Sequence, residues 1–249
     1  MPTSPAQAPP DLAALAGQFG RPEQPAEHDD VARCEALRAQ LLTRDEPVGD
    51  VFETSSGRSD ATTIAAETAN ASCPPDKALF LYRLVRALRP ELVVEFGSAL
   101  GVSGAYLASA LTANGSGRLV TVEGSPSRQQ VAAASIESVA PGVTTSVCGY
   151  FDDHLDVLDG ATLFFNDGNH QEDAVLRYAS AAAERMGRPG VLVIDDIVGY
   201  SAGMASAWRK LQRDRRFTRG VTAGRMALVA LADAQRPRRS WLRWGRRGG

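Results

Sequence analysis

From residue 76 to residue 231, short apolar runs alternate with longer stretches of helical pattern, and this alternation constrains the fold more than any other feature of the chain. An apolar run without polar interruptions has both faces buried, so strands of this kind between helices predict a parallel sheet covered on both sides. The predicted strands are 92–96, 119–122, 144–147, 163–165, 191–194, 217–222 and 226–231, and the predicted helices between them are 102–113, 126–140, 171–187 and 203–213.

The last two predicted strands are joined only by Ala223-Gly224-Arg225. A link this short joins antiparallel neighbours, because a parallel connection needs a long crossover. The sequence therefore predicts an α/β, Rossmann-like, doubly wound sheet of seven strands. The sheet is mostly parallel, ends in an antiparallel hairpin and has helices on both faces.

Composition divides the rest of the chain into segments. Residues 1–30 contain six prolines and predict a flexible leader, although Leu12, Leu15 and Phe19 could form one short docking turn. Residues 31–75 predict an N-terminal helical lid segment. It consists of a helix over 31–42, a polar loop over 43–60 and a short helix over 62–70, and we expect the first helix to pack beside the ligand crevice.

The main domain is predicted over 76–235, and Asp76 is expected to cap its first helix, which ends at Arg89-Pro90. The tail, 236–249, holds six Arg and two Trp and is predicted to be disordered; an anionic partner is the alternative.

Overall composition excludes several function classes. The net charge is −2, which gives no general attraction to nucleic acid or membranes. The chain has no apolar run of membrane-spanning length and no signal-peptide pattern at its start. Three widely spaced cysteines argue against a disulfide framework and favour the reducing cytoplasm. Its 25 Arg against two Lys, Lys77 and Lys210, indicate a compositional bias.

A strand, a glycine turn and a helix follow one another over residues 93–103. Gly97 and Gly101 allow a sharp turn and a close approach of the main chain to a ligand. The turn lacks the middle glycine of the dinucleotide fingerprint, since Ala99 stands there. Glu95 at the end of the strand would repel a pyrophosphate and would suit a cofactor with an ammonium and a sulfonium.

The next strand ends at Glu123, which is followed by Gly124-Ser125-Pro126. A carboxylate at the end of the second strand of such a unit can accept hydrogen bonds from both hydroxyls of a ribose. Ser125 and Pro126 are predicted to be the cap and first residue of the next helix. Together, the two acids predict a nucleoside cofactor.

These motifs resemble motifs one and two of class I S-adenosylmethionine-dependent methyltransferases. Within that class, residues 76–232 are most similar to catechol- and caffeoyl-CoA-type O-methyltransferases, macrolide-sugar O-methyltransferases and cephalosporin-hydroxylase-like proteins. The resemblance implies that the methionine end of the cofactor lies over 97–101, its ribose on Glu123 and its adenine near 149–151. The cofactor-binding residues it implies are Glu95, Gly97, Ser98, Gly101, Ser103, Glu123, Gly124, Ser125, Gly149, Tyr150 and Asp167.

Acidic residues also end the fourth and fifth predicted strands, at Asp167 and at Asp195-Asp196. In a parallel sheet these strand ends meet in one crevice, where converging carboxylates favour a cation such as Mg²⁺. The resemblance implies metal ligation by Asp167, Asp195 and Asp196, although the related branch has Asp-Asn where this chain has Asp-Asp. The alternatives are that one of the pair caps a helix and that Asp167 serves the cofactor alone, since consecutive strand residues point to opposite faces.

His170 follows Asp167 closely and is a candidate general base; the alternative is a histidine that only bonds a carboxylate at the helix start. We therefore expect catalysis by His170 and Asp167, with S-adenosylmethionine as cofactor and Mg²⁺ as the metal ion that the resemblance implies. The expected reaction is methyl transfer to a small-molecule acceptor, at a hydroxyl oxygen. The alternatives are a regulatory or scaffold protein without turnover and a hydroxylase-like activity. A homo-oligomer is compatible with the sequence.

Overall fold

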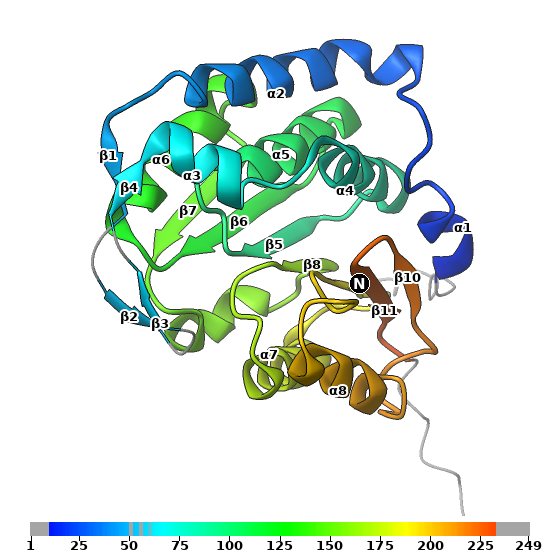
Figure 1. The fold of residues 1–249 in the computed structure, drawn as a ribbon. Helices are drawn as coiled ribbons and strands as arrows, with labels where there is room; N and C mark the ends of the chain where they lie inside the picture. Colours follow the sequence, from blue (N-terminus) through cyan, green and yellow to red (C-terminus); the bar gives the residue numbers. More distant parts are fainter. Residues whose placement is uncertain (1–9, 50–51, 55–56, 60, 233–249) are drawn as a thin grey trace, which may run out of the picture.

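The computed structural model describes residues 10–49, 52–54, 57–59 and 61–232 (Figure 1). The predicted tail over 236–249 and its suggested anionic partner lie outside the described residues, as do the first nine residues of the predicted leader.

A seven-stranded sheet forms the centre of the molecule, in the order β10-β11-β9-β8-β5-β6-β7. The strands from β9 to β7 are parallel, β11 runs antiparallel to β9, and β10 pairs with β11 as the predicted hairpin. The predicted fold class is thus confirmed. The strands are β5 (Leu92–Phe96), β6 (Arg118–Glu123), β7 (Thr144–Cys148), β8 (Leu163–Asn166), β9 (Val191–Ile194), β10 (Val221–Ala223) and β11 (Met226–Ala230).

Helices cover both faces of this sheet (Figure 1). Alternate strand residues point to opposite faces, so Val93 and Phe165 belong to one apolar cluster while Val94 and Phe164 belong to the other. The first face is covered by α4 (Pro75–Leu88), α5 (Val102–Asn114) and α6 (Pro126–Val139), and the second by the 3₁₀ segment η2 (Phe151–Leu158), α7 (Glu172–Arg185) and α8 (Ala202–Leu211).

Helix α2 (His28–Leu41) forms an outer layer over α4 and α5 (Figure 1). The hydroxyl of Tyr82 donates to Asp30 at 2.6 Å, and the hydroxyl of Tyr106 donates to Glu35 at 2.7 Å. These bonds fix α2 against two helices of the main domain. The sequence placed this helix beside the ligand crevice, whereas the structure places it on the outer side of α5.

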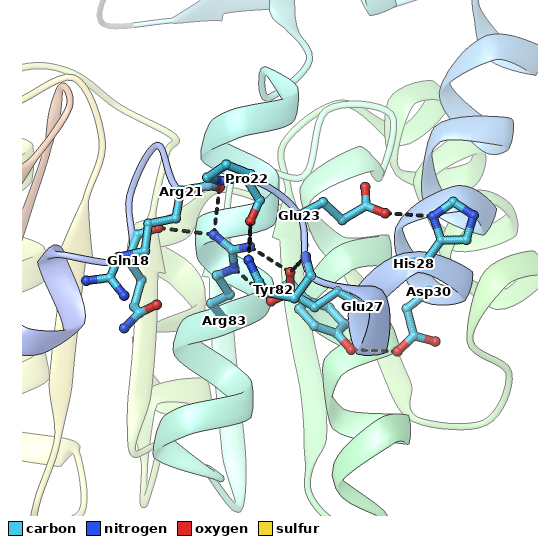
Figure 2. Close-up of polar contacts among 10 residues, drawn as sticks. Gln18, Arg21, Pro22, Glu23, Glu27, His28, Asp30, Tyr82 and Arg83 are labelled. Carbon is cyan, nitrogen blue, oxygen red and sulfur yellow. Dashed lines mark hydrogen bonds and ion pairs between the residues drawn. The ribbon is translucent and has the colours of Figure 1, made fainter.

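Residues 10–27 are anchored to the domain by one buried arginine (Figure 2). Arg83 of α4 donates to the main-chain oxygens of Gln18, Arg21 and Pro22 and to both carboxylate oxygens of Glu27. This segment contains α1 (Leu12–Ala16), which lies against β10 and β11, and the 3₁₀ turn η1 (Pro25–Glu27). The docking turn that the sequence offered as the alternative is the arrangement observed for these residues.

Two local expectations differ from the structure. Asp76 does not cap α4, because the helix already begins at Pro75, whose missing N–H costs nothing at a first helical position. The stretch 43–60 is not only loop, since it contains short antiparallel pairs. These are β1 (Pro47–Val48) with β4 (Thr62–Thr63) and β2 (Phe52–Thr54) with β3 (Gly57–Ser59); the helix after them is α3 (Ile64–Ala71).

The order of the strands locates the ligand crevice. From β5 the chain proceeds to β6 and β7 on one side, and it then returns to β8 and β9 on the other. The carboxyl ends of β5 and β8 are therefore the point where the winding direction reverses, and ligands of such sheets bind there. Among the described residues, no helix combines the length and apolar character needed to cross a membrane.

Candidate active site

A cavity of about 620 Å³ opens at the carboxyl ends of the parallel strands. Its lining includes residues that follow four strands in turn, namely Gly97, Ala99, Glu123, Gly149, Tyr150 and Asp167. All of these except Ala99 were predicted from the sequence as cofactor-binding residues. The structure thus brings the ends of β5, β6, β7 and β8 together around one space.

The floor of the cavity is the main chain of Gly97 and Asp167. Gly97 has φ of +89°, and a β-carbon there would lie 2.6 Å from the carbonyl oxygen of Asp167. Only glycine permits both the dihedral angle and the contact. The loop after β5 is consequently pressed against the loop after β8, and no side chain separates a ligand from it.

Gly101, which the resemblance implies as a cofactor-binding residue, is also required for helix packing. It also has φ of +89°, but a β-carbon there would meet the main chain of Ala132 in α6, at 2.8 Å from its carbonyl oxygen. Its glycine therefore serves the packing of α5 against α6. Ser98 and Ser103 of the same loop and helix start are buried, with 2% and 5% of their surfaces exposed.

Glu95 lies beneath the loop, inside the protein. Its side chain is fully buried and accepts a hydrogen bond of 2.7 Å from the Thr121 hydroxyl of the neighbouring strand. Burial raises the pKa of Glu95 to about 7, although the hydroxyls of Ser103 and Thr121 act in the opposite direction. The structure thus places Glu95 under the cavity instead of at its surface.

Glu123 lies at the cavity and holds the loop in shape. One carboxylate oxygen accepts from the Ala99 amide at 2.9 Å, and the other accepts from the Ser125 amide at 3.0 Å. Each carboxylate oxygen can accept a further bond, so Glu123 can also bind a ligand hydroxyl. Burial raises the pKa of Glu123. Ser125 caps α6 by accepting from the Arg128 amide, as predicted.

Aromatic residues occupy the end of the cavity next to η2. Phe151 stacks on Phe96 with the ring centres 4.9 Å apart and the planes 7° apart, and Tyr178 meets both rings edge-on. Tyr150 is 58% exposed at the cavity. This end therefore offers a flat apolar surface of the kind on which a nucleobase stacks.

Helix α3 forms one wall of the cavity. The sequence predicted a lid segment here but did not identify the residues of this helix that line the cavity. Glu67 and Ala71 of this helix line the cavity, and Glu67 forms an ion pair of 2.8 Å with Arg128 of α6. Both partners are largely buried. The predicted lid segment thus reaches the cavity through its second helix, while its first helix covers α5.

The predicted carboxylate cluster contains two of the three expected aspartates, together with His170. Asp167, His170 and Asp195 each place a potential ligand atom within 4.8 Å of the others. Asp195 is 2% exposed, and burial together with the nearby Asp167 raises its pKa to about 6. His170 lies 3.3 Å from Asp167 through its Nε2 atom. Burial opposes a charge on His170, but the bond to Asp167 and the neighbouring carboxylates outweigh it and raise its pKa.

Asp196 does not join this cluster. It follows Asp195 with φ of +52°, which turns the chain at the end of β9, and its carboxylate binds Arg225 at 2.8 Å. Its other oxygen lies 3.6 Å from His170 Nδ1. The predicted set of three aspartates is therefore not gathered around one point, and His170 takes the third place.

Lys77 is the residue at this site that sequence reasoning missed. Its ammonium lies 2.5 Å from Asp195 Oδ2, and only 15% of its side chain is exposed. Burial lowers its pKa, but Asp167 and Asp195 outweigh that effect and raise it to about 12, so Lys77 is charged. The one signal in the sequence was its rarity, since the chain has only two lysines.

The donor set does not fit the Mg²⁺ site implied by the family resemblance. Asp195 already has the Lys77 ammonium as its partner, and Asp196 already has Arg225. A divalent ion among Asp167, His170 and Asp195 would lie close to a buried ammonium of the same sign. The charged residues at this position therefore do not form a divalent-metal site.

Comparisons with known proteins agree with this architecture. Residues 94–197 match the family model described as a methyltransferase domain. No curated protein matches the chain significantly in sequence.

Three solved structures similar to this fold contain a bound cofactor or product. Cofactor-bound Rv0187 from MTB has a TM-score of 0.56 and 20% identity over 90% of this chain and 97% of that one. The O-methyltransferase from Bacillus cereus in complex with SAH has a TM-score of 0.60 and 16% identity over 88% and 96%. TomG from Streptomyces achromogenes, an O-methyltransferase involved in tomaymycin synthesis in complex with SAM, has a TM-score of 0.58 and 16% identity over 89% and 95%.

Proposed function

We propose that the chain is an S-adenosylmethionine-dependent methyltransferase, because residues 94–197 match the methyltransferase-domain family model, in agreement with the class I resemblance of the sequence. The acceptor we propose is a hydroxyl oxygen of a small molecule. The observation that carries the proposal is Glu123, a cavity-lining carboxylate at the end of β6 whose position suits both hydroxyls of a ribose.

The rest of the cavity supports the same ligand. The main-chain floor at Gly97 leaves room for the methionine portion, and the aromatic end near Tyr150 and Phe151 suits adenine. The solved structures similar to this fold include complexes with SAH and with SAM, and two of those proteins are described as O-methyltransferases.

In the proposed reaction, His170 would accept the proton of the acceptor hydroxyl at Nδ1, because its Nε2 contacts Asp167. The cofactor, held at Glu123 and the loop of Gly97, would supply the methyl group and leave as SAH. Asp167 orients the imidazole through the contact at His170 Nε2 and stabilises the imidazolium that forms. The ring of Tyr200 meets His170 edge-on with the centres 4.9 Å apart and limits its rotation. Displacement at the sulfonium requires an in-line approach and exclusion of water, to which the wall made by α3 contributes.

Calorimetry with SAH tests the proposal directly. Wild-type protein should bind SAH, and Glu123→Ala should weaken binding by on the order of 1.5–3 kcal/mol, about tenfold to a hundredfold in Kd. Glu91→Ala is the matched control. Glu91 is an exposed glutamate directly before the first residue of β5, at the end of the sheet away from the cavity. Equal affinities of wild type and Glu123→Ala would remove the ribose assignment.

Turnover separates the proposed enzyme from a scaffold that only binds the cofactor. Incubation with S-adenosylmethionine and a panel of hydroxylated small molecules, followed by mass spectrometry, should reveal one added methyl group and the formation of SAH. SAH binding without methylated product across sugars, phenols and polyketide alcohols would favour the regulatory role instead.

A further inference from the structure

The buried lysine of the active site occupies a position that normally disfavours it. Lys77 is the third residue of α4, where the helix dipole disfavours positive charge; its amide donates to Asp76 in the same turn at 2.8 Å. It is nevertheless largely buried, with its ammonium on Asp195 of β9. A cation held against the helix dipole requires compensation from its surroundings, and the carboxylates of Asp167 and Asp195 supply it.

We propose that Lys77 is the built-in cation of this active site, which takes the place of a divalent metal ion between the carboxylates and keeps Asp195 and Asp167 in position for His170. Lys77 acts through these residues and is a positioning residue. The exclusion of a metal ion depends only on the contact of Lys77 with Asp195. The positioning of the carboxylates for His170 has a role in catalysis only if the proposed methyl transfer is correct.

Two of the three aspartates at the site are already paired with a basic side chain. Asp195 is paired with Lys77, Asp196 is paired with Arg225, and Asp167 contacts His170. A metal ion would have to displace the ammonium from Asp195 and would then face it at close range. Removal of the lysine charge should reverse the situation, because two carboxylates and an imidazole would remain within 4.8 Å of one another without a cation.

The identity of the residue agrees with this role. The chain has 25 Arg and two Lys, so a lysine at a buried position stands against the general bias of the sequence. An ammonium is a compact point charge and a guanidinium is broad, planar and forked, but both keep the positive charge on which exclusion of a metal ion depends. The second lysine, Lys210, is 61% exposed and pairs with Glu172, so it provides a matched control.

The experiment is a titration of full-length protein with Mn²⁺, in which electron paramagnetic resonance measures free Mn²⁺, combined with thermal unfolding at millimolar Mg²⁺. Wild type, Lys77→Met, Lys77→Arg and Lys210→Met are compared without cofactor and acceptor. We expect wild type, Lys77→Arg and Lys210→Met to bind no Mn²⁺ at submillimolar concentration and to show no shift in Tm. Lys77→Met should gain Mn²⁺ affinity by at least about tenfold and be stabilised by Mg²⁺.

Submillimolar Mn²⁺ binding by wild type, with a rise in Tm in Mg²⁺, would overturn the proposal, and this measurement does not require any variant to fold. Absence of a gain in folded Lys77→Met would also overturn it, because the charge of Lys77 would then not be what excludes the metal. A failure of the proposed methyltransferase function would appear separately, as a lack of SAH binding by wild type.

Discussion

The guanidinium of Arg83 and the carboxylate of Glu27 are joined by two parallel hydrogen bonds, from Nε to Oε1 at 2.7 Å and from Nη2 to Oε2 at 2.6 Å. The remaining donors of Arg83 bind three main-chain oxygens of residues 18–22 (Figure 2). A bidentate pair this well buried fixes the geometry of both partners. The segment before α2 is therefore part of the folded domain, at least from Gln18 onward.

Replacement of Arg83 by leucine should destabilise the protein by about 3–5 kcal/mol, because the buried carboxylate of Glu27 loses its charged partner and three carbonyl groups lose the hydrogen bonds that Arg83 donates. Urea unfolding measures the loss, and limited proteolysis should cut near Arg21 more rapidly. Arg86→Leu, one turn further along α4 and exposed, is the control and should change stability by less than about 1 kcal/mol. Equal effects of the two variants would show that the anchoring contributes nothing.

Gly97→Ala should be more harmful than the same change at another glycine with positive φ. In the variant, backbone strain and an overlap with the carbonyl of Asp167 should together lower the free energy of unfolding by about 2–5 kcal/mol. Gly142 has φ of +77°, and a β-carbon there would have no neighbouring atom within 4 Å. Gly142→Ala therefore has the backbone strain without the overlap, and it should lower the free energy of unfolding by about 1 kcal/mol. Chemical denaturation and SAH affinity measure both effects, and similar losses would contradict the close approach at the cavity floor.

Glu95 should make stability depend on pH in the opposite direction to an ordinary paired carboxylate. Its pKa in the folded protein is about 7 against 4.5 for the unfolded chain, so the folded state loses stability as pH rises between these values. Glu95→Gln removes this loss. The free energy of unfolding of the variant, relative to that of wild type, should therefore increase by on the order of 2–3 kcal/mol from about pH 5 to about pH 8. Urea unfolding at both pH values tests it, with Glu91→Gln as the exposed control; a constant difference would contradict the raised pKa.

Glu67→Ala should loosen the cavity wall made by α3. The ion pair of Glu67 with Arg128 joins α3 to α6 with both side chains largely buried, so its loss should speed amide hydrogen exchange in α3 and weaken SAH binding severalfold. Glu46→Ala, which removes an exposed pair with Arg44 in the same N-terminal segment, should change neither measurement. Unaltered exchange in α3 would show that other contacts hold this wall.

The sheet and its strand ends could be predicted because each depends on short-range pattern. Apolar runs of three to six residues predicted burial on both faces, and the parallel order then placed Gly97, Glu123 and Asp167 at one edge. The three-residue link ending at Arg225 was sufficient to predict the antiparallel hairpin. These inferences needed no knowledge of how side chains pair across the molecule.

The charge pairing of the site could not be predicted in this way. Lys77 and Asp195 are 118 residues apart, and nothing local to either one indicates the other. Asp196 left the cluster because of one left-handed residue at the end of β9, where a strand pattern predicts only extended conformation. The proline content of the leader similarly concealed its anchoring, because the interaction is made by Arg83 in a distant helix.

The main-chain floor of the cavity restricts how the substrate range of this protein can be altered. Gly97 leaves no space for a side chain, so mutation there cannot reshape the pocket without breaking the loop that forms it. Glu67 and Ala71 on α3 and Tyr150 before η2 line the same cavity with side chains. A directed-evolution library aimed at new ligands should therefore randomise these wall positions and leave the glycine loop untouched.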